Sequence, residues 1–190
     1  MRKGRLESAV WRADAPAMSE PVQSFRLAKM SPSIWVLTAI FLPLPLVLAA
    51  AALACGGPPV LLAAAAFVAL VYASVWLWFR PTRFELTPGA LRIVWPIRRR
   101  EIELASVESL EIVSGRELRR EFGLLLRVGA GGLWGGFGML WSSKGRHLDF
   151  YVSRLAPLVL IRRRLGRSLL ITPDDPERFA AELRARASSA

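Results

Sequence analysis

The pattern of apolar and polar positions changes sharply twice along the chain. Residues 31–79 carry no charge at all. Two windows within this stretch, 34–54 and 59–79, are each long enough to cross a bilayer as a helix, which takes about 20 apolar residues. Gly-Gly-Pro-Pro at 56–59 ends the first helix and begins the second, because glycine loosens the backbone and proline lacks the amide donor. The pattern predicts a transmembrane hairpin of two helices.

The charges beside this hairpin predict its orientation. Arg26 and Lys29 precede the first window and Arg80 and Arg83 follow the second, whereas the 55–58 loop has no basic residue. By the positive-inside rule both termini then lie in the cytoplasm, which makes this a multi-pass protein of the cytoplasmic membrane. A signal peptide does not fit, because the apolar run is too long and a polar segment precedes it.

Aromatic residues mark both ends of the hairpin. Four side chains are expected to anchor at the boundary between lipid and water, namely Trp35, Trp76, Trp78 and Arg80. Pro43 and Pro45 predict a kink in the first helix. No charged residue lies within the hairpin, which argues against a pump, a channel or a proton relay.

The two flanking segments differ from each other. Residues 1–30 mix Gly, Pro, Ser and charge without a period, and we interpret them as a disordered or partly helical cytoplasmic tail. Residues 80–190 show short alternating segments separated by turns, which predicts a cytoplasmic β domain. The strands come at close spacing without helices between them, which favours a meandering antiparallel sheet or a small barrel. The expected strands are Phe84–Leu86, Leu91–Trp95, Glu101–Leu104, Val107–Ile112, Phe122–Val128, Phe137–Trp141, Leu148–Val152, Leu158–Arg162 and Ser168–Ile171.

A helix is expected at the end of this domain, over about 173–187. Thr172 is the expected N-cap and Pro173 the first helical residue. Phe179 and Leu183 recur on one face together with Ala187. The opposite, polar face would carry Glu182, Arg184 and Arg186. The domain therefore combines several strands with one amphipathic capping helix.

Several segments of this domain resemble bacterial pleckstrin-homology-like (bacterial PH) domains. The resemblance covers about 80–185 and is closest to a membrane-attached branch of the family. It is carried by the hairpin FELTPGALRI, by REIEL and VESL after it, and later by GGFG, LDFYV and LITPDDPERF. It implies a seven-stranded, partly open barrel plugged by a C-terminal helix, attached to transmembrane segments and without catalytic residues.

Composition limits the partners and the metal or disulfide sites that this chain can have. The chain is 53% hydrophobic and has a net charge of +11, of which residues 1–30 contribute +3 and residues 80–190 contribute +8. Such a basic balance suits nucleic acid, anionic lipid or the cytoplasmic flanks of a membrane protein, and the hairpin favours the last. The single cysteine, Cys55, rules out a disulfide within the chain and a cysteine zinc site. The single histidine, His147, leaves little room for a histidine-based metal site.

Sequence motifs give no support for catalysis. The glycine-rich run at 129–138 lacks the Gly-Lys-Ser/Thr of a phosphate loop, and Trp134 stands where a third fingerprint glycine would be needed. His147 and Asp149 have the spacing to share one face of a strand, but no Ser or Cys nucleophile accompanies them by motif. We expect no catalytic residue, cofactor or metal, and hence no enzyme.

Two arginine clusters remain as candidate binding residues. The first comprises Arg98, Arg99 and Arg100, and the second comprises Arg162, Arg163, Arg164 and Arg167. They are either solvated hairpin loops or contacts to anionic lipid headgroups, for which each basic residue near the surface contributes about 1 kcal/mol. Nucleic acid is not an expected partner, because no aromatic residues alternate with these arginines as a stacking surface requires.

The sequence thus predicts a membrane-anchored binding or scaffold module with a PH-like domain at the cytoplasmic membrane face. Apart from the lipid bilayer, it would engage a protein partner, its own oligomer or anionic headgroups. The alternative is a non-catalytic accessory subunit of a membrane enzyme or transporter whose site is completed by a partner.

Overall fold

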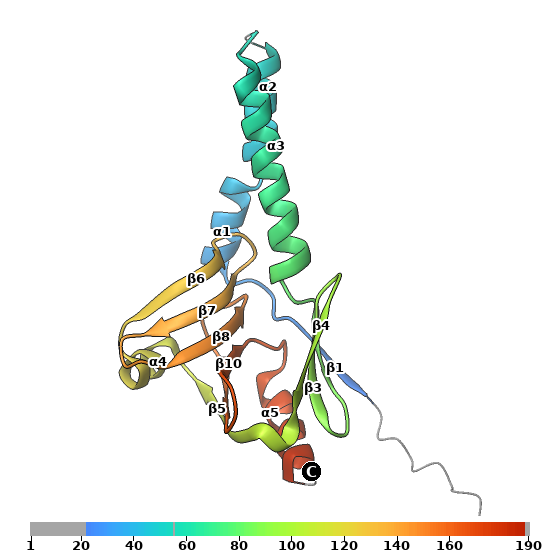
Figure 1. Cartoon of the computed structure of the whole chain (residues 1–190), viewed down its shortest axis with the longest axis vertical. Helices are drawn as coiled ribbons and strands as arrows, with labels where there is room; N and C mark the ends of the chain where they lie inside the picture. Colours follow the sequence, from blue (N-terminus) through green and yellow to red (C-terminus); the bar gives the residue numbers. More distant parts are fainter. Residues whose placement is uncertain (1–21, 55, 189–190) are drawn as a thin grey trace, which may run out of the picture.

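A computed structural model describes residues 22–54 and 56–188. A long helical hairpin projects from a β domain (Figure 1). Two helical segments of this hairpin, Pro32–Ala54 and Pro59–Phe79, are long and apolar enough to cross a membrane by length and composition. Most of their side chains are exposed, as Leu46 and Leu53 are at 73% and 75%. This exposure is unlike that of a core helix in a soluble domain.

The first segment of the hairpin is broken near its prolines. Helix α1 (Pro32–Phe41) and helix α2 (Leu44–Ala54) meet at a turn formed by Leu42 and Pro43. The interruption lies at the expected kink, because Pro43 and Pro45 cannot donate backbone hydrogen bonds to the preceding turn. The second segment is α3 (Pro59–Ser74), which continues as the π-helical turn η1 (Val75–Phe79).

Four antiparallel strands form the first sheet, in the order of the sequence: β1 (Gln23–Arg26), β2 (Arg83–Leu86), β3 (Ala90–Val94) and β4 (Arg99–Glu103). Residues 1–30 were expected to form a disordered or partly helical tail. For the described part this is wrong, because Gln23–Arg26 form strand β1. Phe25 lies opposite Phe84 and is 5% exposed. A four-residue strand with one buried side chain is too short to show a period, which explains why the pattern missed it. Residues 1–21 of the expected tail lie outside the described residues.

The second sheet has six strands in the order β5-β9-β10-β8-β7-β6. Their bounds are β5 (Val107–Val113), β6 (Leu125–Gly131), β7 (Gly136–Ser142), β8 (His147–Val152), β9 (Leu158–Arg163) and β10 (Ser168–Ile171). Strands β8 and β10 are parallel, so the expected antiparallel meander is wrong at that point. In the described residues the backbone ladders form two sheets, and no ladder closes them into one barrel.

A helix that the sequence did not predict lies between β5 and β6. Helix α4 (Gly115–Phe122) begins with a capping box: Ser114 Oγ accepts the Glu117 amide at 3.3 Å, and Glu117 Oε2 accepts the Ser114 amide at 2.6 Å. Phe122, expected to open a strand, ends this helix, and the strand begins at Leu125. The helix is mostly charged over eight residues, so its few apolar positions gave no clear helical period.

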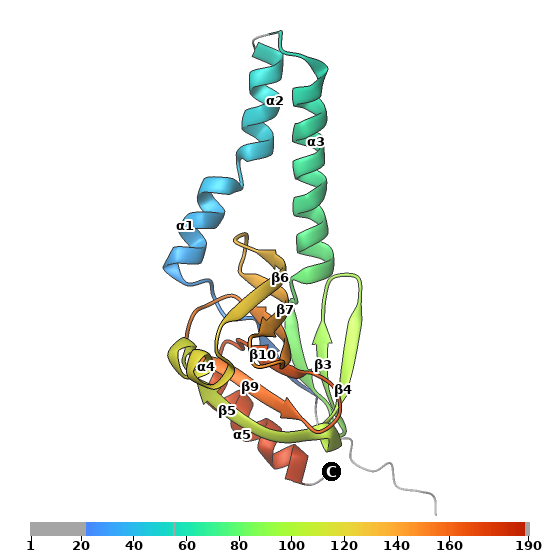
Figure 2. The same cartoon turned by 60° about the vertical axis from the view of Figure 1, so that its left-hand side comes forward.

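The C-terminal helix α5 (Pro176–Ser188) packs against the core, as expected. Phe179 and Leu183 are fully buried, and the Phe179 ring meets Phe25 edge-on at 5.2 Å. The helix begins later than predicted, because Asp175 Oδ1, and not Thr172, accepts the amide of the first turn, from Arg178. The core that this helix completes takes side chains from both sheets. Figure 2 shows α5 beside strand β5 of the second sheet.

The predicted polar face of α5 is wrong at one residue, Arg186. Arg186 was predicted on the exposed face, but it is only 6% exposed and donates a hydrogen bond to the Leu86 carbonyl at 3.0 Å. The helical period alone places residue 186 beside the buried stripe of Phe179 and Leu183. The charged end of the side chain reaches a strand-end carbonyl, and this hydrogen bond compensates its burial.

Candidate anion-binding cleft

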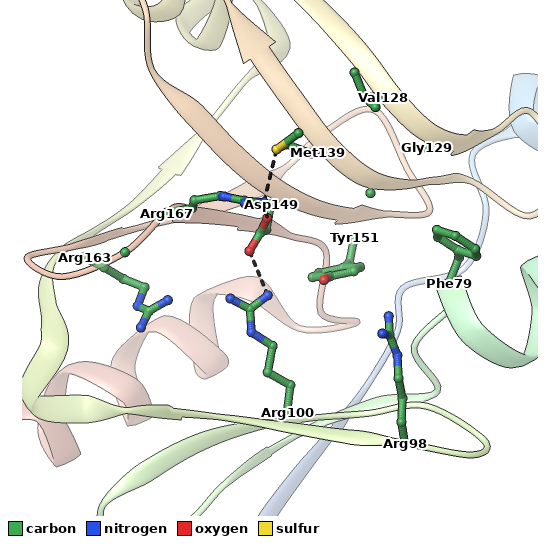
Figure 3. A pocket seen from close by; sticks show the side chains of 12 residues that line it. Phe79, Arg98, Arg100, Val128, Gly129, Met139, Asp149, Tyr151, Arg163 and Arg167 are labelled. Atoms are coloured by element: carbon green, nitrogen blue, oxygen red, sulfur yellow. Dashed lines mark hydrogen bonds and ion pairs between the residues drawn. The ribbon is translucent and has the colours of Figure 1, made fainter.

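A cleft of about 590 Å³ lies between the two sheets, beside the end of the helical hairpin. Phe79 comes from the hairpin, strand β4 supplies one wall, and the second sheet supplies the other (Figure 3). The lining residues are Phe79, Arg98, Arg100, Val128, Gly129, Gly138, Met139, Asp149, Tyr151, Arg163, Gly166 and Arg167. Four of the seven arginines proposed from the sequence therefore meet in one cavity.

Strand alternation divides the first arginine cluster. Arg99 and Arg100 are both in β4, so their side chains point to opposite faces of the sheet. Arg100 points into the cleft and donates to Asp149 Oδ2 at 2.7 Å. Arg98 precedes the strand, and its guanidinium lies 4.4 Å from the centre of the Trp95 ring. Arg99 is exposed and does not line the cleft.

The second cluster is divided in the same way. Arg163 lines the cleft, while Arg162, its neighbour in β9, points to the opposite face. There Arg162 forms ion pairs with Glu111 and with Glu121, the latter at 2.8 Å. Arg167 lies across the β9–β10 turn and donates to Asp149 Oδ1 at 3.2 Å. The expectation that each cluster acts as one unit on its own hairpin loop is therefore wrong, because both clusters are divided between the cleft and other faces.

Arg164 lies outside the cleft. It is exposed in the turn after β9, where its backbone amide donates a hydrogen bond to the Ser106 carbonyl at 2.8 Å. Its side chain adds to the general positive potential of the surface.

Asp149 organises the cleft. Its side chain is 8% exposed, and its two oxygens accept from Arg100 and from Arg167, on opposite sides of the cavity. The sequence suggested His147 as its neighbour, but the His147 ring lies against Trp141 at 5.3 Å. Asp149 therefore fixes two guanidinium groups, a contact that joins residues 49 positions apart and that sequence spacing gave no means of finding.

Aromatic side chains connect the cleft to the hairpin. The indole N–H of Trp95 donates to the carbonyl of Phe79 at 3.0 Å, and its ring meets Tyr151 at 5.3 Å. Burial, and then the charge of Asp149, raises the pKa of the Tyr151 phenol. The phenol is thus a protonated hydrogen-bond donor at neutral pH.

The cleft has a positive charge that its own groups do not neutralise. Four arginines face one carboxylate, which gives +4 − 1 = +3. Burial, and then repulsion from Arg100, lowers the pKa of Arg163. The charged guanidinium groups of the cleft therefore repel one another. An anion in the cavity would reduce this repulsion and would meet guanidinium groups suited to phosphate or carboxylate.

The glycine-rich segment joins β6 to β7 and contacts the hairpin. Trp134 has a left-handed φ of 59°, and its amide donates to Thr38 Oγ1 at 3.0 Å. Its ring packs edge-on against Trp76 at 5.0 Å and Tyr72 at 6.3 Å. Four of these glycines lie within β6 and β7, and the turn between the strands attaches the β domain to the hairpin through Trp134.

The four expected interface anchors have different surroundings. Trp35 and Trp78 are exposed, at 59% and 47%. Trp76 packs against Trp134, and the Arg80 guanidinium lies 4.4 Å from the centre of the Trp76 ring. Within residues 22–54 and 56–188, no group of three His, Cys, Asp or Glu side chains is placed to hold a metal ion.

The fold and the cleft define a class of protein: a two-sheet β domain completed by a C-terminal helix, with an arginine-lined cavity between the sheets. PH domains, which are generally non-catalytic binding modules, form such a class. Residues 82–187 match the family model described as Bacterial PH domain, and the chain belongs to this family. A comparison with curated proteins and with solved structures gives no match.

Proposed function

We propose that this protein is a membrane-anchored PH-like module that binds anionic groups at the cytoplasmic face of the membrane. One observation carries the proposal: the hairpin is inserted between β1 and β2, which are hydrogen-bonded neighbours. Both ends of the hairpin therefore join the same end of one small sheet, where Arg26 pairs with Arg83. A chain that crosses a bilayer between these strands must cross it an even number of times, which the two apolar segments do.

The orientation follows from charge. Basic residues flank the hairpin on the side of the β domain, and the 55–58 loop at its far end has none. The positive-inside rule then assigns the β domain, and with it both termini, to the cytoplasm. Trp35, Trp78 and Arg80 would lie at the boundary of that leaflet, where indole rings and arginine are favoured.

The cleft is the proposed binding site. Arg98, Arg100, Arg163 and Arg167 present guanidinium groups to one cavity, and Phe79, the last residue of the second apolar segment, lines its edge. A headgroup at the membrane surface would thus be close to the cavity. Of the remaining candidates, Arg99 and Arg164 add surface charge, and Arg162 is already neutralised by two carboxylates.

The single cysteine provides the test of this arrangement. In intact cells that express the full chain, a membrane-impermeant maleimide should label Cys55, which lies in sequence between the two apolar segments. The matched control is Cys55→Ser combined with Ala105→Cys, which places the only thiol at an exposed position of the β domain. This variant should react only after the cells are permeabilised. Labelling of Ala105→Cys in intact cells, or protection of Cys55 until lysis, would refute the topology.

A further inference from the structure

A second cavity, of about 510 Å³, lies on the outer face of the six-stranded sheet, away from the arginine cleft. Helix α4 covers one end of this face through Leu118 and Phe122. Helix α1 approaches the other end and contributes Ile34 and Leu37 to the cavity wall. We call the space between these two helices the outer groove.

The floor of the outer groove is apolar. Phe150, Leu125 and Val152 belong to, or pack on, the cluster of buried side chains on this face of the sheet. Gly136 lies directly against this floor, because a Cβ at this position would lie 2.7 Å from the Phe150 ring. An apolar cavity of this size with a few polar groups at its edge is typical of sites for small, largely apolar ligands.

The rim of the groove is positively charged. Arg119, Arg127 and Arg154 line it, and its lining contains no carboxylate. None of the ion pairs within the described residues involves these three arginines. Arg154 is held in place by a hydrogen bond to the Pro173 carbonyl at 2.9 Å, and the Arg127 guanidinium lies 5.5 Å from the centre of the Phe150 ring.

We propose that the outer groove holds an acyl chain of one anionic phospholipid, whose phosphate binds at Arg127 and Arg154. Two of its wall residues, Ile34 and Leu37, belong to the apolar segment Pro32–Ala54, so the groove opens onto the bilayer if that segment spans it. The inference rests on the proposed function to this extent.

The chemistry of the walls favours a lipid over a peptide. A peptide against Ile34 and Leu37 would leave backbone amides without hydrogen-bond partners in an apolar environment, which is unfavourable. An acyl chain has no such groups. The positive rim in turn favours an anionic headgroup over a zwitterionic or neutral one.

Lipid retained by the purified full chain tests the proposal. After extraction in a mild detergent and extensive washing, native mass spectrometry should detect one bound phospholipid, and extraction with solvent should identify it as anionic. Leu37→Trp fills the groove from the side of α1 and should abolish this retention. Leu53→Trp is the matched control, because it makes the same change at an exposed site at the far end of the hairpin.

The charged rim has its own control. Arg127→Gln should lower the retained lipid about fivefold, since one basic residue near a phosphate contributes about 1 kcal/mol. Arg116→Gln removes the same charge from an exposed site on α4 outside the groove and should leave retention unchanged.

Equal retention by Leu37→Trp and Leu53→Trp would overturn the proposal, because the lipid would then be part of the general lipid shell. Retention of a fatty acid or a neutral lipid in place of an anionic phospholipid would also overturn it. The labelling of Cys55 is independent of both results. A failure of the groove is therefore distinguishable from a failure of the membrane topology.

Discussion

The carboxylate of Asp149 should have two opposite effects, on stability and on anion binding, and Asp149→Asn separates them. The substitution keeps the size of the side chain and removes the charge between Arg100 and Arg167. Breaking a buried ion pair costs about 3–5 kcal/mol. The two arginines are 40% and 54% exposed, so solvent screens part of this loss, and we expect about 1–2 kcal/mol.

The same substitution should improve anion binding. It raises the charge of the cleft from +3 to +4 and frees two guanidinium groups. Removing one negative charge beside the bound anion should strengthen its binding by about 1 kcal/mol, so phosphate should bind about fivefold more tightly. Bound phosphate should also restore part of the lost stability, because ligands that bind only the folded state raise its free energy of unfolding.

The assay uses the full chain in nanodiscs of neutral phosphatidylcholine, because β1 is separated from the β domain by the hairpin and its Phe25 completes the core. Thermal unfolding is followed while inorganic phosphate replaces chloride at constant ionic strength. Wild type, Asp149→Asn and the control Asp174→Asn, an exposed carboxylate outside the cleft, are compared. Nanodiscs that contain phosphatidic acid then distinguish a lipid headgroup from free phosphate as the source of the anion.

One result would refute the reasoning about the cleft. If phosphate stabilised Asp149→Asn no more than it stabilised Asp174→Asn, the four arginines would not form an anion site. A loss of stability without any effect of phosphate would mean that Asp149 only holds the two sheets together.

Four further predictions concern the fold. Phe179→Ala should lower the free energy of unfolding by about 3–5 kcal/mol, because the ring is fully buried in the core, and an unchanged thermal midpoint would contradict this. Ser114→Ala removes the N-cap of α4 and should cost about 1 kcal/mol in denaturant unfolding. Hydrogen bonds from the backbone and side chain of Ser114 lower the pKa of Glu117, so the stability advantage of wild type over Glu117→Gln should be complete above the ordinary pKa of glutamate. It should disappear as the pH falls through the lowered value, and a pH-independent difference would refute the contact. Gly138→Ala should destabilise strongly, because φ is +133° and the new Cβ would lie 2.9 Å from the Gly129 Cα, whereas Gly89→Ala, with open space around it, should be close to neutral in the same unfolding assay.

Much of the fold could be predicted from local pattern. The two apolar helical segments, most strands of the β domain and the C-terminal helix follow from periods of 3.6 and 2 and from proline and glycine punctuation. Strand β1 and helix α4 could not be predicted in this way. The first buries little beyond Phe25, and the second is mostly charged, so neither presents a period. Both are stabilised by partners that are distant in sequence, β2 for one and the outer face of the second sheet for the other.

The arginine clusters show where local reasoning stops. Alternation along a strand already separates Arg99 from Arg100 and Arg162 from Arg163, since neighbours in a strand point to opposite faces. Which of these faces looks into the cleft depends on how the first sheet packs on the second, and that is fixed by the core around Phe25, Phe84 and Phe179. Replacing all arginines of one cluster at once would therefore remove charge both from the cleft and from the surface outside it. Single substitutions avoid this: Arg100→Gln or Arg163→Gln should weaken phosphate binding, while Arg99→Gln or Arg164→Gln, which remove the same charge from outside the cavity, should lower only the salt-dependent attraction to an anionic membrane.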